Sequence, residues 1–255
     1  MMKRKMSGRP DDAVKSLVKM VSILDAFSTS RRSLSLADIS SVTGFPRSTT
    51  HRLAASMRDV GLLDQDRHRD RYRLGLKLFE LGNTVLANMD LHREARPLVD
   101  ALNRISGHLV HLGVFDGQKA IVIHRVSADS GMPLTLIEAA PVHCTSVGKA
   151  ILAFQPAAKI DAVIASGLKR FTDATITDGR KLKSDLKLVR DRGYAVDEGE
   201  HQPGIRCIGA PIHDRNGRVV AGLSVSGPAR RLKKDQIPEL AKIVVHHASL
   251  VATKL

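Results

Sequence analysis

The stretch that decides the fold reads LADISSVTGFPRSTTHRLAASMRDV and spans residues 36–60. Its first half places apolar side chains at helical spacing before the chain breaks at Gly44-Phe45-Pro46, and these side chains are Leu36, Ile39 and Val42. Pro46 suits the first turn of a new helix, because its φ is fixed and it has no N–H to lose. Two short helices joined by a tight turn are therefore expected, as in a helix-turn-helix.

The second of these helices has two different faces. Its inward face is marked by residues at three- and four-residue steps, namely Thr50, Leu53, Met57 and Val60. The rest of the helix is polar and basic, and the candidate DNA-binding residues on it are Arg47, Ser48, Thr49, His51 and Arg52. Such a face favours a recognition helix in the major groove. An ordinary helical hairpin with a solvated face is the alternative.

The distribution of charge supports a nucleic-acid partner. The chain has 255 residues and a formal net charge of +14, which favours a polyanion. Residues 1–75 hold 15 Lys and Arg against 8 Asp and Glu, so half of the net charge lies in less than a third of the chain. With no Trp and 3% aromatic residues, the stacking platforms of single-strand or RNA binders are poorly supplied. Double-stranded operator DNA is the expected partner.

The segment that follows predicts a wing. Residues 62–74 read as two short strands around a charged turn, directly after the second helix. Arginines alternate along it and would share one face of a β-ribbon: Arg67, Arg69, Arg71 and Arg73. Such a face would meet phosphates or a minor groove, with Arg67 and Arg69 as the candidate DNA contacts. A plain solvated hairpin is the alternative, and the basic tail at 1–11 is either a DNA-binding arm or a solvated tail.

The remaining chain predicts a second, chemically different domain. Helical spacing marks a linker helix within residues 76–94, and a further helix has Pro97 near its start. Beyond His108 strands and helices mix, so residues 95–255 are expected to form an α+β domain, while residues 1–75 form the DNA-binding domain. The expected strands are 109–114, 120–126, 134–138, 194–196, 207–212 and 219–225, and the expected helices are 145–154, 157–165, 180–193 and 236–254.

Signals for secretion, membrane insertion and catalysis are incomplete. The start MMKRKM is not followed by an apolar segment, and no run approaches the roughly 18 apolar residues of a membrane span, so a cytoplasmic protein is expected. Gly148-Lys149-Ala150 resembles the end of a P-loop, but His143 stands where the first Gly is required and Ala150 where Ser or Thr is required. GLSVS at 222–226 lacks the last Gly of G-x-S-x-G. No enzyme activity and no cofactor are expected.

Four residues carry side chains that could ligate a metal ion: His143, Cys144, His201 and Cys207. Their spacing lacks a zinc signature, so no metal site is expected. Two rival classes of protein remain open at this point. An enzyme with an attached DNA-binding module would need a catalytic constellation, and a winged helix that binds only proteins would not need the wing arginines.

Two segments could hold a carboxylate ligand. Thr145-Ser146-Val147-Gly148 opens a predicted helix and offers hydroxyls, backbone N–H groups and the positive end of a helix dipole. Ser224 and Ser226 alternate with apolar residues, so both hydroxyls face the same side of a strand. Taken one by one, each serine could equally be an ordinary hydroxyl satisfied within the protein.

Several long motifs, in order, resemble the IclR family of bacterial transcriptional regulators. They are LADISSVTGFPRSTTHRL, RYRLG at 71–75, TSVGKAILA at 145–153, RGYAVDEGEHQPGIRCIGAPI at 192–212 and GLSVSGP at 222–228. The resemblance covers about residues 14–252. It implies an α+β chain with an N-terminal winged helix-turn-helix, a linker helix and a C-terminal GAF-like α/β effector-binding domain. It also implies a homodimer or homotetramer, with small organic acids or aromatic metabolites as effectors.

The resemblance also implies site residues and a function. The positions matching Asp197, Cys207, Ser224 and Ser226 approach the ligand in the family, and Ile205 helps to form an apolar wall. With the N-terminal residues of the predicted helix, the candidate effector site is Ser146, Gly148, Asp197, Ile205, Cys207, Ser224 and Ser226. The expected function is sequence-specific operator binding that regulates catabolic genes and is modulated by a small carboxylate or aromatic-acid metabolite. Thr50 departs from the family, which usually has an apolar residue there.

Overall fold

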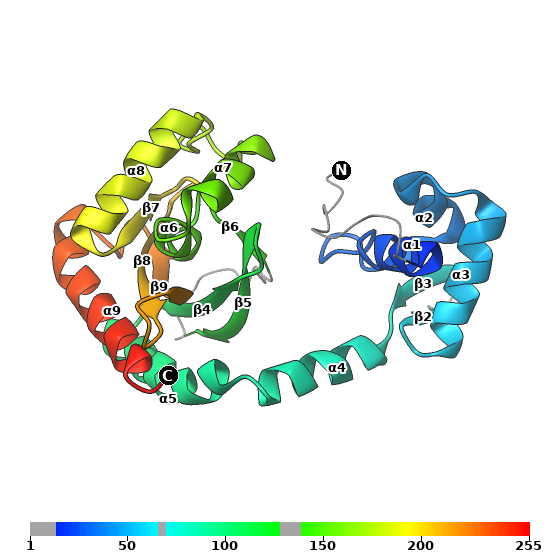
Figure 1. Cartoon of the computed structure of the whole chain (residues 1–255), viewed down its shortest axis with the longest axis horizontal. Coiled ribbons are helices and arrows are strands. Elements are labelled where there is room, and N and C mark those ends of the chain that lie inside the picture. The colour runs from blue at the N-terminus through cyan, green and yellow to red at the C-terminus, as the bar shows by residue number, and fades with distance from the viewer. Residues whose placement is uncertain (1–13, 66–69, 128–138) are drawn as a thin grey trace. The chain divides into compact units, whose positions relative to one another are not determined.

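The computed structural model describes residues 14–65, 70–127 and 139–255. The chain divides into two compact units, residues 1–88 and 89–255, each of which has its own hydrophobic core (Figure 1). Three predictions lie outside the described residues: the basic arm at 1–11, the wing-tip residues Arg67 and Arg69, and the strand at 134–138. No helix in the described ranges is long and apolar enough to cross a membrane.

The first unit is a winged helix-turn-helix followed by a further helix (Figure 1). Its three-stranded antiparallel sheet has the order β1-β3-β2. The core is apolar and includes Ile23, Ile39, Leu53, Met57 and Tyr72. In chain order the elements are α1 (Lys15–Leu24), β1 (Leu34–Ser35), α2 (Leu36–Thr43), α3 (Arg47–Asp59), β2 (Leu63–Gln65), β3 (Arg71–Leu74) and α4 (Leu76–Ala87).

Local signals set the two helices of the motif. A capping box starts α2, because the Asp38 N–H donates to Ser35 Oγ at 3.1 Å and the Ser35 N–H donates to the Asp38 carboxylate at 2.9 Å. Gly44 ends α2 with a φ of 73°, a left-handed conformation that glycine adopts without strain. Pro46 then precedes α3 directly. The predicted pair of helices and the tight turn between them are confirmed.

The inward face of α3 agrees with the prediction at three of four positions. Thr50, Leu53 and Met57 are buried, but the side chain of Val60 is 62% exposed, so its predicted burial is wrong. The reason is that α3 ends at Asp59 and Val60 is only its C-cap. Burial of Thr50 costs little, because its hydroxyl donates to the Pro46 carbonyl at 3.1 Å.

The second unit is a six-stranded antiparallel sheet covered on both faces (Figure 1). Its strand order is β6-β5-β4-β9-β8-β7. Helices α5 and α9 pack on one face, and α6 lies on the other with α7 and α8 beyond it. In chain order the elements are α5 (Asp90–Ser106), β4 (Leu109–Phe115), β5 (Lys119–Val126), β6 (Ala139–Pro141), α6 (Ser146–Leu152), α7 (Ala157–Ala165), α8 (Gly179–Arg192), β7 (Ala195–Glu198), β8 (Ile205–His213), β9 (Val219–Pro228), η1 (Lys234–Gln236) and α9 (Ile237–Ala252).

Glycines in the sheet let α6 lie directly on it. A Cβ on Gly209 would fall 2.5 Å from the Ser146 carbonyl oxygen, and one on Gly222 would fall 3.0 Å from the Val147 carbonyl oxygen. A larger residue at either position would push the helix away from the strands. The N-terminal end of α6 is therefore held close to the middle of the sheet, which is where a pocket lies.

The structure corrects the predicted position of Pro97. It lies inside α5, which begins at Asp90, and not near the start of a helix. Proline inside a helix removes one backbone hydrogen bond, so the sequence alone favours a position near the start of a helix. Here tertiary packing outweighs that cost, because Ala95, Val99 and Leu102 on the same helix are fully buried in the core.

Candidate functional site

The outward face of α3 is open to solvent. Arg47, Ser48, His51 and Arg52 are exposed, whereas Thr49 is half-buried. Among the described residues, no hydrogen bond or ion pair engages the side chains of Arg47 or Arg52. Two guanidinium groups on one exposed helix face are thus available for phosphates or for the edges of bases.

The described arginines of the wing are used within the protein. Arg71 and Arg73 share the face of β3 opposite the buried Tyr72, as the alternation predicts. However, Arg71 donates to the Ser33 carbonyl at 2.7 Å, and Arg73 forms an ion pair with Asp64 at 2.6 Å. These two arginines stabilise the hairpin in the free chain, and contact of the arginine row with DNA stays a prediction. The role of Arg67 and Arg69 stays a prediction.

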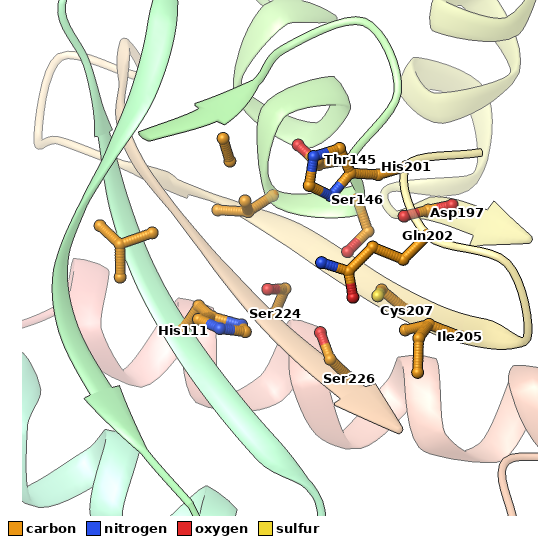
Figure 2. A pocket seen from close by; sticks show the side chains of 13 residues that line it. His111, Thr145, Ser146, Asp197, His201, Gln202, Ile205, Cys207, Ser224 and Ser226 are labelled. Atoms are coloured by element: carbon orange, nitrogen blue, oxygen red, sulfur yellow. The ribbon is translucent and has the colours of Figure 1, made fainter. Parts of the chain in front are cut away.

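A pocket in the second unit gathers most of the predicted effector residues. Six of the seven line it: Ser146, Asp197, Ile205, Cys207, Ser224 and Ser226 (Figure 2). They come from α6 and from three neighbouring strands, β7, β8 and β9. Ser224 and Ser226 both face the pocket, while Leu223 and Val225, which alternate with them, point into the core on the other face of the sheet.

Gly148 does not line the pocket. A Cβ there would fall 2.4 Å from Val142 Cα, so this position needs glycine for close packing. Its N–H already donates to Thr145 Oγ1 at 3.2 Å, which caps α6. A carboxylate in the pocket would therefore meet the hydroxyl of Ser146 rather than the backbone of Gly148.

Asp197 is the buried acid of the pocket. It is 2% exposed, and its Oδ1 accepts a 2.7 Å hydrogen bond from the backbone N–H of Glu200. Burial raises the pKa of Asp197 to about 6, against the opposing effects of that N–H and of the positive charge on Lys149. Near neutral pH this carboxyl is thus close enough to its pKa to act as a hydrogen-bond acceptor or, when protonated, as a donor.

Several lining residues were not predicted from the sequence, and they are His111, Val122, Ala140, His201 and Gln202. Thr145 and Val147 also line the pocket and belong to the segment that was expected to hold a carboxylate. Of the residues that were missed, His111 sits on β4 directly opposite Ser224 on β9, and residues paired in this way share a face of the sheet. The sequence signal for His111 existed in the alternation of β4, but the neighbour of β4 in the sheet could not be known in advance.

The four candidate metal ligands, two histidines and two cysteines, have other surroundings in the structure. His143 Nε2 lies 2.9 Å from the Lys169 carbonyl oxygen, and Cys144 is buried. Burial raises the pKa of the Cys207 thiol well above its usual range. Within the described ranges, no set of three or more His, Cys, Asp or Glu side chains is arranged to hold a metal ion.

A winged helix-turn-helix, followed in the chain by an α/β unit that contains a pocket, defines a class of DNA-binding protein. Family comparisons make this specific. Residues 16–67 match the IclR helix-turn-helix domain, and residues 83–253 match the domain described as bacterial transcriptional regulator IclR C-terminal. The chain therefore belongs to the IclR family of DNA-binding transcriptional regulators, as its motifs suggest.

Individual relatives agree with this assignment. The chain is 31% identical over 247 residues to the HTH-type transcriptional regulator KdgR of Escherichia coli, covering 96% of this chain and 94% of KdgR. It is 35% identical over 246 residues to the glycerol operon regulatory protein of Streptomyces coelicolor, covering 95% and 96% of the two chains. Among solved structures, an IclR homolog from Microbacterium hydrocarbonoxydans complexed with 4-hydroxybenzoate is similar, with a TM-score of 0.79, 25% identity and coverage of 94% and 98%. These relatives are regulators rather than enzymes.

Proposed function

We propose that this regulator controls catabolic genes by binding an operator, and that a small carboxylate or aromatic-acid metabolite in the pocket modulates the binding. The observation that carries the effector half of this proposal is the convergence of Ser146, Asp197, Cys207 and two β9 serines on one pocket from four separate elements. The Microbacterium relative supports the ligand class, because its structure holds 4-hydroxybenzoate. A regulator of this kind works in the cytoplasm.

In this proposal, operator contacts come from α3 and the wing. Arg47, Ser48, Thr49, His51 and Arg52 form the recognition surface, with Arg52 as a reader of base edges. Arg67 and Arg69 at the wing tip contact phosphate. The exposure of four of the five α3 residues supports this assignment.

The pocket chemistry fits a carboxylate with an apolar body. The hydroxyls of Ser146 and Ser226 would donate to the carboxylate, Ser224 would pair with a further oxygen of the ligand, and Ile205 would pack against the carbon skeleton. Asp197 would accept a hydrogen bond from a ligand hydroxyl or, protonated, donate one. A ligand changes the affinity for DNA only by as much as it prefers one arrangement of the protein over another. Tight binding of the ligand alone therefore does not regulate operator binding.

We place the DNA-binding domain at residues 1–75, the linker helix at 76–94 and the effector-binding domain at 95–255. We also propose a homodimer or homotetramer, since one recognition helix reads only a half-site. Unpartnered apolar surface supports this assembly. On α1 and α4 the exposed apolar side chains are Leu17, Val18, Val21, Leu76, Phe79, Leu81 and Val85.

An operator titration tests the proposal. The full chain would be titrated onto DNA from upstream of its own gene in a mobility-shift assay, with and without a panel of aromatic and aliphatic carboxylates. Calorimetry on the same panel would identify the acids that bind. A specific shift that one or more bound acids strengthen or weaken is expected. If the protein binds its operator specifically but binds none of the acids in the panel, the proposed class of effector is wrong.

A further inference from the structure

His111 lies in the wall of the pocket with an unused hydrogen-bonding atom. The residue is 4% exposed, and its Nε2 has no hydrogen-bond partner among the described residues. Buried polar atoms in proteins almost always have a partner, because leaving one unpaired costs free energy. A ligand atom that pairs with Nε2 would remove this cost on binding.

Sheet register separates His111 from Asp197 within the pocket. His111 pairs with Ser224, whereas Asp197 pairs with Cys207. The order β4-β9-β8-β7 separates the two side chains by three strand spacings, on the order of 14 Å. Figure 2 shows them on opposite sides of the pocket, with Ser224 between them. A ligand can therefore meet polar groups at two distant points.

Apolar side chains line the same pocket beside these polar groups. Val147 lies on α6 and Ile205 on β8, while Val122 on β5 and Ala140 on β6 lie on the side of β4 away from Asp197. A ligand in the pocket would thus present a carbon skeleton to these side chains and polar atoms to Asp197, the serines and His111.

The charge state of His111 limits which ligand group can pair with its Nε2. Burial, and then the positive charge of Arg125, lower the pKa of His111 to about 4, so the ring is neutral near pH 7. A neutral imidazole has one donor and one acceptor nitrogen. A hydroxyl pairs with Nε2 in either tautomer, because it both donates and accepts. A second carboxylate only accepts, so it pairs with Nε2 in one tautomer alone.

We infer that the effector is a hydroxy acid, with its hydroxyl remote from the carboxylate, and that His111 is the specificity-determining residue that recognises this hydroxyl. The inference rests on the proposed effector role of the pocket. The carboxylate then lies toward Ser146 and Ser226, and the hydroxyl lies beside His111 and Ser224.

Matched acids test the inference by calorimetry on the full chain. The probes are 4-hydroxyphenylacetate against phenylacetate and 4-hydroxybutyrate against butyrate. In the wild type, the hydroxylated member of at least one pair is expected to bind roughly 10- to 100-fold more tightly. His111→Leu should reduce that ratio to about twofold or less, and His111→Gln, which keeps a polar atom, should retain most of it.

A matched control is available on α9. His247 is also buried, but its Nδ1 already lies 2.8 Å from the Ile243 carbonyl oxygen and it does not line the pocket. His247→Leu should leave the affinity ratio unchanged. As a second readout, the ring nitrogens of ¹⁵N-labelled His111 should shift when the hydroxylated acid is added and stay in place with its unhydroxylated partner, which also decides the matter if His111→Leu does not fold.

The outcomes separate this inference from the proposed function. Binding of hydroxylated and unhydroxylated acids with equal affinity, or a ratio that His111→Leu leaves intact, would overturn the role of His111 alone. Absence of binding by every acid in both pairs and in the wider panel would overturn the effector class and this inference together.

Discussion

Asp197 and Glu200 are joined at the edge of the pocket, where the backbone N–H of Glu200 donates to Asp197 Oδ1 over 2.7 Å. The Glu200 carboxylate in turn meets the ammonium of Lys149 on α6 at 2.5 Å. Lys149 also reaches Asp185 on α8 at 3.0 Å. A pocket carboxyl on β7 is thereby connected to two helices through ionic and hydrogen-bonded contacts.

Replacement of Lys149 by methionine should destabilise the second unit strongly. Lys149 is 1% exposed, and its removal leaves the buried carboxylate of Glu200 without a counter-charge. Breaking a buried ion pair in this way costs about 3–5 kcal/mol. Chemical denaturation would measure the loss. The control is Lys183→Met, whose ion pair with Asp161 is 55% exposed on the lysine side and is expected to contribute less than about 1 kcal/mol. Equal losses for the two variants would contradict a structural role for the buried pair.

Asp197→Asn should change how stability depends on pH. The pKa of Asp197 is about 6 in the folded protein against the ordinary value of 3.8, so the folded state binds more protons and the wild type loses stability as pH rises from about 4 through 6. Asparagine does not ionise and escapes this loss. The stability of the variant relative to wild type should therefore rise by about 2 kcal/mol between pH 4 and pH 7.

Asp178→Asn provides a control of opposite sign. The backbone N–H of Lys181, which Asp178 caps at the start of α8, lowers the pKa of that carboxyl, so its contribution to stability is present above its unfolded pKa and lost as pH falls. Relative to wild type, this variant should gain stability toward acid pH. Denaturation midpoints measured every half pH unit would separate the two trends, and parallel trends would contradict the assigned cause.

The elements that the sequence predicts well are those with local causes. Gly44 and Pro46 define the turn between α2 and α3 by their own backbone geometry, and alternation alone puts Ser224 and Ser226 on one side of β9. Each signal acts within a few residues, so no knowledge of distant neighbours is needed.

The features that the sequence missed depend on contacts between distant segments. His111 enters the pocket because β4 pairs with β9, more than 100 positions further along the chain. Arg73 forms an ion pair with Asp64 because the two residues lie opposite each other in the wing. The alternation of arginines does not reveal this register. Likewise, α5 continues through Pro97 because of its burial against the core.

Arg52→Ala should weaken binding to the operator more than binding to unrelated DNA. Arg52 is exposed on α3, where a bidentate contact to guanine discriminates by about 1–3 kcal/mol. Arg69→Ala should instead weaken binding to all sequences alike and reduce the salt dependence, because a phosphate contact carries no sequence information.

Arg58→Ala is the control for Arg52→Ala on α3, since the Arg58 side chain contacts Asp59 and Gln65. An Arg52→Ala protein that binds its operator like wild type would move the recognition surface elsewhere.

Charge placed on the apolar face of α4 should dissociate the assembly. Leu81 and Val85 lie one helical turn apart on α4 and are exposed in the single chain, and no residue of α4 is buried in the described structure. We expect Leu81→Glu with Val85→Glu to shift the mass from dimer or tetramer to monomer in light scattering at micromolar concentration, because the carboxylates would have to be desolvated on association. Leu188→Glu, on the exposed side of α8, should leave the mass unchanged. A wild-type protein that is already monomeric would rule out the assembly.

The double variant Ser224→Ala with Ser226→Ala should remove the response to the effector and leave operator binding intact. Both hydroxyls are buried, face the pocket and belong to a strand remote in sequence from the recognition helix. Allosteric coupling is typically about 1–3 kcal/mol, so the wild type should show a roughly 5- to 150-fold change of operator affinity with its ligand, and the double variant should show none. The measurements are calorimetry with a binding acid from the panel and operator titration with and without it. Ser184→Ala, on exposed α8 outside the pocket, should respond like wild type. Unchanged ligand affinity in the double variant would show that the carboxylate is held by other residues.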